Sequence, residues 1–563
     1  MFGTQVHRVL TVEPGPLLVL VPAVGQTCDH WLGLRERLSQ EPQLAGADWL
    51  LYNHNLRAFS SRTLWDAAVG LAAKIREFDE YEATRPSKTY SQIILIGHGA
   101  GGLLVRMAYL IGAGAVDGKP LPWSQKVSRL ILFATLNRGF DPRRWGWLSF
   151  PIRGLLLMPW FRFGRSYMKG SSNIANLRIS WINHFRQLEN RYAQATATAA
   201  GGPAGSFPGA LQDGSSPASQ PLQPVVIQIN GAHDRQLNPS DNADIDQFSR
   251  ATQVTLQGVG RADVFHGWQD EVRYTELRHQ ILTAQGDSLS PHTDASPEIK
   301  DVVFLVHGIR ACNSDWPRRA AEILQRDFSK VIPITAGYSY FSALNFAVPF
   351  MRRLQIRWMQ DEYSNQFAKY RNARFYFIGH SNGTYLLGRL LDRVPSVKFE
   401  RVTLVGSVLP QSFDWESHLE KRVMDYRNHR AASDIPVGLL CSLLRGCFMS
   451  DIGTAGFNGF LPGDLRREVF YYKGGHGSAL KDTKNLAELI RYTLLGGTPT
   501  YAVTPDLQPG VMSLLSRTMP YVPSAVVAAL ALAFYFGVIT LTSTLLWVSG
   551  IVLVMLLLVL KVA

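Results

Sequence analysis

The stretch "LIGHGAGG" at residues 95–102 joins two apolar segments through a run of glycines. The apolar residues at 93–96 predict a buried strand, and those at 103–105 begin a predicted helix. A tight strand-to-helix turn of the form G-x-S-x-G exposes a nucleophilic serine in many hydrolytic enzymes. Gly99 stands where that serine would be, so the sequence predicts the turn without its hydroxyl.

The same pattern occurs a second time, and there the serine is present. "FYFIGHSNG" (375–383) matches "IILIGHGAG" (93–101), which places Ser381 opposite Gly99. Apolar strands that alternate with helical patterns predict parallel βαβ units. The sequence therefore predicts two α/β domains of one design, each a mainly parallel sheet flanked by helices, related by duplication. Two further pairs of segments match: 17–31 with 302–316, and 128–136 with 400–409.

Composition divides the chain further. Residues 195–224 are rich in Ala, Gly, Pro and Ser, so we expect a flexible insertion within the first domain. The expected order is an α/β domain at 1–282, a linker at 283–300, a second α/β domain at 301–500, a juxtamembrane segment at 501–521 and a membrane hairpin at 522–560.

The C-terminal tail is apolar and carries no charge from Val522 to Leu560. One span needs about 20 apolar residues, so the tail is long enough for two. Residues 542–544 (Thr-Ser-Thr) offer a polar midpoint, and Arg517 and Lys561 flank the segment. We expect a hairpin with both ends in the cytoplasm. A single tilted helix and a buried helix pair are the alternatives.

Charge and cysteine content limit the classes of protein. The formal net charge is +13, but the basic residues are scattered among aromatic ones, which favours contact with anionic lipid. The absence of a zinc-finger, helix-turn-helix or RNP motif argues against nucleic acid as a partner. The four cysteines are Cys28, Cys312, Cys441 and Cys447, and their spacing suggests neither a disulfide framework nor a metal site. We expect no cofactor and no secretory signal peptide.

The second domain has the residue types of a nucleophilic hydrolase, in the chain order Ser, acid, His. Ser381 lies between Gly379 and Gly383, and glycines leave room for a strained turn. His476, in "YYKGGHGSAL", lies on a glycine-flanked loop after the last expected strand, where a general base is accessible. A lone histidine is otherwise more often a surface or core residue. The backbone N–H groups of Ile309 and Asn382 are the expected oxyanion donors.

The acid of the triad is less clearly indicated. In "RVMDYRNHRAASDIPVG", Asp434 follows a predicted strand and is placed to orient the imidazole. Asp451 on a later loop is the rival, whereas Asp425 lies within the strand. We favour Asp434.

Residues 302–494 resemble the α/β-hydrolase superfamily of serine esterases and lipases. The shared features are the "GHSNG" turn, the "LVHGI" loop and the late Gly-Gly-His. The resemblance implies an acyl-enzyme mechanism that needs no metal or cofactor. It does not identify a substrate, because this fold supports many chemistries.

Residues 17–282 resemble the same superfamily but depart from it at the catalytic positions. By resemblance, Asp234 in "INGAHDRQLNP" occupies the acid position. Gly99 replaces the serine, and Arg261 stands where the second copy has His476. His266 follows nearby but has no nucleophile to serve. We therefore expect the first domain to be a pseudoenzyme.

Two segments combine aromatic and aliphatic residues with arginines. Residues 143–167 fit either a cap over the first site or a surface that contacts lipid headgroups. Residues 338–358 have the same character and would suit an acyl-chain pocket beside Ser381. With the tail, they suggest an active site that faces a membrane.

Two functions follow from these patterns. The favoured one is a membrane-anchored serine hydrolase of carboxylic esters, lipid-derived esters included, with Ser381, Asp434 and His476 as its triad. The alternative is a non-catalytic membrane scaffold in which both domains only bind. The coherent second site beside a degenerate first one favours the enzyme, and peptidase or thioesterase chemistry stays open.

Overall fold

The computed structural model describes residues 5–7, 15–57, 60–83, 90–116, 118–144, 161–199, 223–234, 236, 239–245, 248, 250–261, 264–283, 299–309, 315–335, 337, 342–461, 467–497, 510–536, 546–547 and 549–550. The chain divides into two compact units. Unit 1 contains Met1–Ala295 with Tyr363–Arg371, and unit 2 contains Ser296–Glu362 with Asn372–Ala563.

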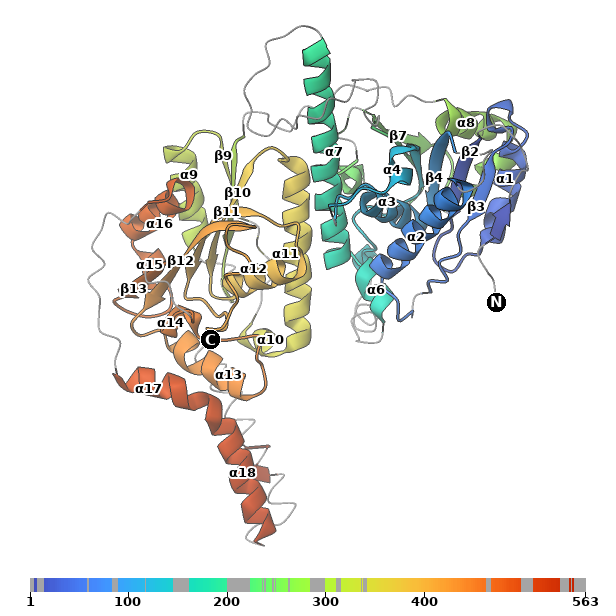
Figure 1. Ribbon diagram of the computed structural model, residues 1–563. Helices are drawn as coiled ribbons and strands as arrows, with labels where there is room; N and C mark the ends of the chain where they lie inside the picture. Colours follow the sequence, from blue (N-terminus) through green and yellow to red (C-terminus); the bar gives the residue numbers. More distant parts are fainter. Residues whose placement is uncertain are drawn as a thin grey trace. The chain divides into compact units, whose positions relative to one another are not determined.

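The described strands of unit 1 form a seven-stranded sheet in the order β1-β3-β2-β4-β5-β6-β7 (Figure 1). The pairs are parallel except for β1 with β3. The strands are β1 (Gln5–His7), β2 (Pro16–Val21), β3 (Asp48–Leu51), β4 (Gln92–His98), β5 (Val127–Phe133), β6 (Val225–Gly231) and β7 (Ala251–Leu256). The helices are η1 (Cys28–Trp31), α1 (Leu32–Leu38), η2 (Pro42–Leu44), α2 (Leu64–Ala83), α3 (Ala100–Gly112), α4 (Pro122–Gln125), α6 (Arg162–Tyr167), α7 (Ser172–Ala199), η5 (Pro239–Asn242), η6 (Phe265–Gln269) and α8 (Glu271–Leu282).

In unit 2, the described strands form a six-stranded parallel sheet in the order β13-β12-β11-β10-β8-β9. They are β8 (Asp301–Val306), β9 (Val331–Ile334), β10 (Arg374–His380), β11 (Phe399–Val405), β12 (Val423–Ala431) and β13 (Glu468–Tyr472). The helices are α9 (Trp316–Asp327), α10 (Ala343–Ala347), α11 (Pro349–Lys369), α12 (Asn382–Arg393), the π-helical turn η8 (Pro436–Cys441), α13 (Ser442–Gly446), α14 (Ala455–Asn458), α15 (Ser478–Lys481), α16 (Thr483–Leu495), α17 (Gly510–Thr518), η9 (Met519–Tyr521) and α18 (Val522–Tyr535). The part of α11 from Tyr363 onward belongs to unit 1.

The central strands are buried because helices cover both faces of each sheet. Strand β2 reads "PLLVLV", and every residue in it is buried. Such uninterrupted apolar runs are typical of parallel strands that are covered on both sides. In unit 1, α1 and α8 supply Leu34, Leu38 and Leu277 to one core. In unit 2, α9 and α16 supply Leu324 and Leu489 to the equivalent core.

The two sheets share one strand order. Strands β3-β2-β4-β5-β6-β7 of unit 1 run in the same sequence of neighbours as β9-β8-β10-β11-β12-β13 of unit 2. The prediction of two α/β domains with mainly parallel sheets is confirmed.

The apolar tail begins as a helix that is long and apolar enough to cross a membrane. Residues Gly510–Tyr535 meet this criterion by length and composition, and no residue of an 18-residue apolar stretch within this helix is buried. The rest of the expected hairpin, from residue 537 to 560, lies mainly outside the described residues. The hairpin therefore stays a prediction.

Several other expectations fall on residues that the structure does not describe. Of the expected insertion at 195–224, α7 includes the residues up to Ala199, and 200–222 lie outside the description. The same holds for 284–298 of the linker, 145–160 and 338–341 of the two aromatic segments, 501–509 of the juxtamembrane segment, and Cys312.

Candidate active site

Four loops of unit 2 follow neighbouring strands at one edge of the sheet. Ser381 follows β10, Gly406 follows β11, Asp434 lies shortly beyond β12, and His476 lies shortly beyond β13. Because these strands are parallel, their carboxyl ends lie along the same edge. Ligands bind at this edge in open α/β sheets.

Ser381 sits at the turn between β10 and α12 in a left-handed backbone conformation, with φ 53° and ψ −120°. A residue with a side chain holds such a conformation only where its surroundings impose it. The backbone N–H of Ser381 donates to the Val405 carbonyl at 3.0 Å. The Thr384 hydroxyl donates to the Ser381 carbonyl at 2.7 Å. The strained turn is therefore fixed from both sides.

The two glycines that flank Ser381 are required by close packing. A methyl group at Gly383 would lie 2.4 Å from the Val306 carbonyl oxygen, and one at Gly379 would lie 2.4 Å from the Phe377 ring. The G-x-S-x-G spacing in this chain is thus explained by contacts within the fold.

His476 and Asp434 form a hydrogen-bonded pair. The His476 Nδ1 and an Asp434 carboxylate oxygen are 2.9 Å apart. The other Asp434 oxygen accepts the backbone N–H of Val437 at 3.0 Å. The Asp434 side chain is fully buried, whereas 20% of the His476 side chain is exposed. The carboxylate is therefore fixed and can hold the orientation of a partly accessible imidazole.

The two other candidate acids are engaged elsewhere. Asp451 forms an ion pair with Arg352 at 3.0 Å and accepts the Tyr385 hydroxyl at 2.7 Å. Asp425 forms an ion pair with Arg467 at 2.9 Å. The structure brings His476 together with Asp434, the residue that we favoured, and gives Asp451 a different role.

Gly406 lies against the His476–Asp434 pair. Its φ is 53°, and an added methyl group would lie 2.8 Å from His476 Nδ1 and 3.2 Å from an Asp434 oxygen. A side chain at this position would displace the imidazole.

One of the expected oxyanion donors, Asn382, directly follows Ser381, and the residue before the other, Gly308, lies close to the Ser381 side chain. A methyl group at Gly308 would lie 3.3 Å from Ser381 Oγ, so the loop that leads into Ile309 runs beside the hydroxyl. Asn382 is the first residue of α12 and is 1% exposed. A backbone N–H at the start of a helix favours developing negative charge.

His380, the residue before Ser381, is a neutral part of the scaffold. Its Nε2 lies 3.2 Å from the His476 carbonyl oxygen. Burial and the neighbouring His476 lower the pKa of His380 to about 3. His380 therefore donates this hydrogen bond without placing a charge beside the candidate site.

Unit 1 keeps the turn. Gly99 has φ 56° and ψ −117°, nearly the values of Ser381. A methyl group at Gly101 would lie 2.3 Å from the Val21 carbonyl oxygen, which repeats the packing of Gly383 on Val306. The backbone is thus the same in both units, and the hydroxyl is missing from one.

Arg261 occupies the place of the histidine in unit 1. The His98 ring hydrogen-bonds to the backbone of Arg261, as His380 does to that of His476. The Arg261 guanidinium lies 4.0 Å from Asp234 and donates to the Ala134 carbonyl at 3.0 Å. An arginine thus faces the acid position that His476 faces in unit 2.

Ala134 is a further departure, and it was missed from the sequence. Ala134 directly follows β5, as Gly406 follows β11, and both have positive φ values, 44° and 53°. In unit 1 a methyl group therefore occupies the position that would crowd the imidazole in unit 2. The matched segments 128–136 and 400–409 place Ala134 opposite Gly406, but only the fold shows what the difference excludes. His266 lies exposed in η6.

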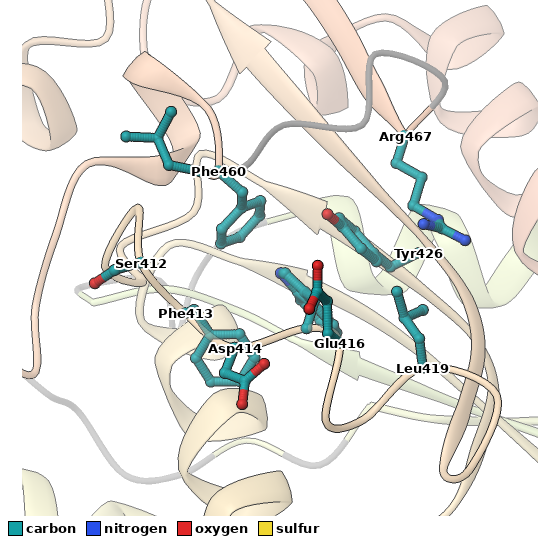
Figure 2. Close-up of a pocket in the computed structure, with 10 residues that line it drawn as sticks. Ser412, Phe413, Asp414, Glu416, Leu419, Tyr426, Phe460 and Arg467 are labelled. Atoms are coloured by element: carbon teal, nitrogen blue, oxygen red, sulfur yellow. The ribbon is translucent and has the colours of Figure 1, made fainter.

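A cavity of about 540 Å³ lies elsewhere in unit 2 (Figure 2). Its aromatic wall contains Trp415 and Tyr426, which stack at 4.0 Å, with Phe460 edge-on to both. Neither Ser381 nor His476 is among its lining residues, which are Ser412, Phe413, Asp414, Trp415, Glu416, Leu419, Tyr426, Phe460, Leu461 and Arg467. Within the described part of the chain, no group of three or more His, Cys, Asp or Glu side chains is placed to hold a metal ion.

No protein-family model and no curated protein matches this chain. Among solved structures, it is similar to Est1E from Butyrivibrio proteoclasticus with bound ferulic acid, at 13% identity over 49% of this chain and 94% of that one, with a TM-score of 0.29. It is similar to the Pyrobaculum calidifontis esterase at 16% identity, over 50% and 79% of the chains, with a TM-score of 0.31. It is also similar to the Paleococcus ferrophilus monoacylglycerol lipase at 11% identity, over 49% and 98%, with a TM-score of 0.28. The chemistry proposed below rests on this chain's own residues.

Proposed function

We propose that unit 2 is a serine hydrolase of carboxylic esters, with Ser381 as nucleophile, His476 as general base and Asp434 as the acid that orients it. The observation that supports this most is the 2.9 Å contact between His476 and the buried Asp434, at the sheet edge where Ser381 directly precedes α12. A nucleophile, a base and an orienting group converging at one edge are what acyl transfer requires.

In the proposed acylation step, Ser381 Oγ attacks the ester carbonyl carbon while His476 Nε2 takes the hydroxyl proton. The carbonyl oxygen becomes an oxyanion, which the N–H groups of Ile309 and Asn382 stabilise. One such donor contributes about 3 kcal/mol to the transition state. His476 then returns the proton to the leaving oxygen, and the alcohol departs from the acyl-enzyme.

In the proposed deacylation step, water attacks the acyl carbon while His476 Nε2 takes its proton. The tetrahedral intermediate collapses, Ser381 Oγ regains a proton from His476, and the carboxylic acid leaves. Asp434 stays ionised throughout and holds the imidazole tautomer with hydrogen on Nδ1.

This function is tested by ester hydrolysis with the purified full chain, using p-nitrophenyl esters of graded acyl length. Ser381→Ala should lose on the order of 10⁶-fold in kcat, as for triads that act as a unit. The exposed Ser412→Ala is the matched control and should keep full activity. If the parent chain hydrolyses none of these esters, the proposed ester hydrolase fails.

We propose that unit 1 is a pseudoenzyme. The combination of Gly99, Arg261 and Ala134 supports this, because it removes the nucleophile, replaces the base and fills part of the base's space. The shared strand order of the two sheets supports a duplication.

We also propose that the tail anchors the chain to a membrane, with both units facing the cytoplasm and lipid-derived esters as substrates. The charge-free run from Val522 to Leu560 supports the anchor, and it begins with α18, a helix in which no residue is buried. Truncation before Val522 should move the protein from the membrane fraction to the soluble fraction. In sealed vesicles, protease should reach both units from the cytoplasmic face only. Protection on that face would overturn the proposed orientation.

A further inference from the structure

Helices α17 and η9, which directly precede the apolar run that begins at Val522, pack against other elements of unit 2. Ser516 in α17 is 3% exposed, and its hydroxyl accepts the Asn458 side-chain amide at 2.8 Å and lies 3.3 Å from the Ser442 hydroxyl. A methyl group at Gly446 would lie 2.3 Å from the Pro520 carbonyl oxygen, so α13 packs directly on η9. These contacts hold α17 and η9 against α13 and α14.

The helices that contact α17 and η9, which are α13 and α14, lie at the sheet edge that carries the candidate site. Helix η8 begins at Pro436, shortly after Asp434, and continues into α13. In α14, the Gly456 N–H donates to the Ser407 carbonyl at 2.7 Å, shortly beyond β11. The tail is thus attached at the carboxyl edge of the sheet.

The outward side of this region exposes apolar side chains. Val511 and Leu514 lie one helical turn apart on α17 and are 70% and 62% exposed, on the side away from the buried Ser516. Phe448, which follows α13, is 94% exposed. Arg445 and Arg517 lie in the same elements and are exposed. We call these five residues the juxtamembrane face: Arg445, Phe448, Val511, Leu514 and Arg517.

The chain changes direction between α17 and α18. Pro520 lies in η9, between α17 and α18, and Figure 1 shows α18 directed away from the sheet of unit 2. A short helix with apolar and basic side chains exposed, followed directly by the apolar helix α18, suits the headgroup layer of a bilayer.

We propose that the juxtamembrane face is a second membrane contact, in which α17 lies along the bilayer surface and Phe448 enters it. The occupant is a phospholipid bilayer with anionic headgroups, which the arginines would bind. The inference rests on the proposed anchor and deepens it: the tail would hold the carboxyl edge of the sheet, and hence the candidate site, toward the lipid.

The test uses the full chain in vesicles of phosphatidylcholine and phosphatidylglycerol, with the photoreactive residue benzoylphenylalanine placed at one position at a time. Position Leu532 in α18, 57% exposed, reports on the anchor. Position Phe448 reports on the juxtamembrane face. Position Leu495, 63% exposed, is the negative control. It lies toward the opposite edge, because Arg401 near the start of β11 donates to the Thr493 carbonyl at 2.9 Å.

We expect phospholipid adducts at Leu532 and Phe448 and none at Leu495. Adducts at Leu532 without any at Phe448 would overturn this inference and leave the anchor standing. Absence of adducts at both positions would overturn the anchor as well. Adducts between two copies of the chain at Phe448 would identify a protein interface in place of the lipid contact.

A second measurement does not depend on the substitution. A phospholipid with a diazirine in its acyl chain, added to the unmodified protein, should label peptides that contain Phe448 or Leu514. Arg445→Gln with Arg517→Gln should reduce that labelling several-fold in the anionic vesicles, while labelling of α18 is unchanged. Labelling confined to α18 in the parent protein would contradict the inference.

Discussion

Ala134 in unit 1 and Gly406 in unit 2 occupy the same place after the corresponding strand, both with positive φ. In unit 2 the absence of a side chain leaves room for the His476 ring, and in unit 1 a methyl group fills that room. This pair explains why the first site differs from the second by more than the loss of one hydroxyl, and it indicates what would be needed to restore it.

Restoring unit 1 should require three changes. In a Ser381→Ala background, Gly99→Ser alone should give no turnover, because a guanidinium cannot accept the serine proton at neutral pH. Adding Arg261→His should still give no turnover, because the Ala134 methyl group would crowd the introduced imidazole. With Ala134→Gly as well, fluorophosphonate labelling should become detectable in a Ser381→Ala background. Labelling of Gly99→Ser in the same Ser381→Ala background, with Arg261 and Ala134 unchanged, would contradict the roles given to Arg261 and Ala134.

Gly406→Ala should impair catalysis without unfolding unit 2. Ala134 shows that alanine tolerates this backbone conformation, but the new methyl group would lie 2.8 Å from the His476 imidazole. A displacement of the base by about 1 Å should lower kcat about 100-fold. The control is Gly477→Ala, whose methyl group would meet nothing within 4 Å. Equal kcat values for the two variants would count against the proposed role of Gly406.

Asp434→Asn should lower catalytic activity, whereas Asp451→Asn should lower thermal stability. The first keeps an acceptor for Val437 N–H but loses the carboxylate at His476, so kcat should fall about 10⁴-fold. The second removes the anionic partner of the buried Arg352, so the thermal midpoint should fall while kcat changes little. Steady-state kinetics with differential scanning fluorimetry separates the two. A larger kcat loss in the Asp451 variant would reverse the assignment.

Acid should destabilise unit 2 through its buried histidines. Burial lowers the pKa values of His380 and His429 from 6.5 to about 3. Below pH 6.5 the unfolded chain binds protons that the folded chain binds only near pH 3, so stability present above pH 6.5 is lost as the pH falls toward 3.

At about pH 5 each of these histidines should cost on the order of 2 kcal/mol. His429→Gln should therefore lose less of its thermal midpoint than the parent between about pH 7.5 and about pH 5. Equal losses in the two proteins would contradict the contribution of His429.

The fold could be predicted because its signals are local. The apolar strands and the glycine turns around Gly99 and Ser381 are continuous in the sequence, and the packing of Gly383 on Val306 shows why those glycines occur. The sequence favoured Asp434 but left Asp451 as a rival, because both lie on loops beyond β12. What separates them is Arg352 from α11, a partner distant in sequence.

The steric effect of the Ala134 methyl group could not be predicted from the sequence for a similar reason. The sequence aligns Ala134 with Gly406, but the effect of the methyl group depends on the His476 ring, which lies on the loop beyond β13. The docking of Ser516 on Ser442 and Asn458 likewise joins segments far apart in the sequence, so composition predicted the apolar tail without its attachment.

The central claim is that Ser381 is the nucleophile of the chain. Its most direct test is labelling of the full-length protein with a fluorophosphonate, followed by peptide mass spectrometry. We expect one phosphonylated site, in the peptide that contains Ser381, and no labelling of Ser381→Ala. Undiminished labelling of that variant, or a modified serine elsewhere in the parent chain, would contradict it.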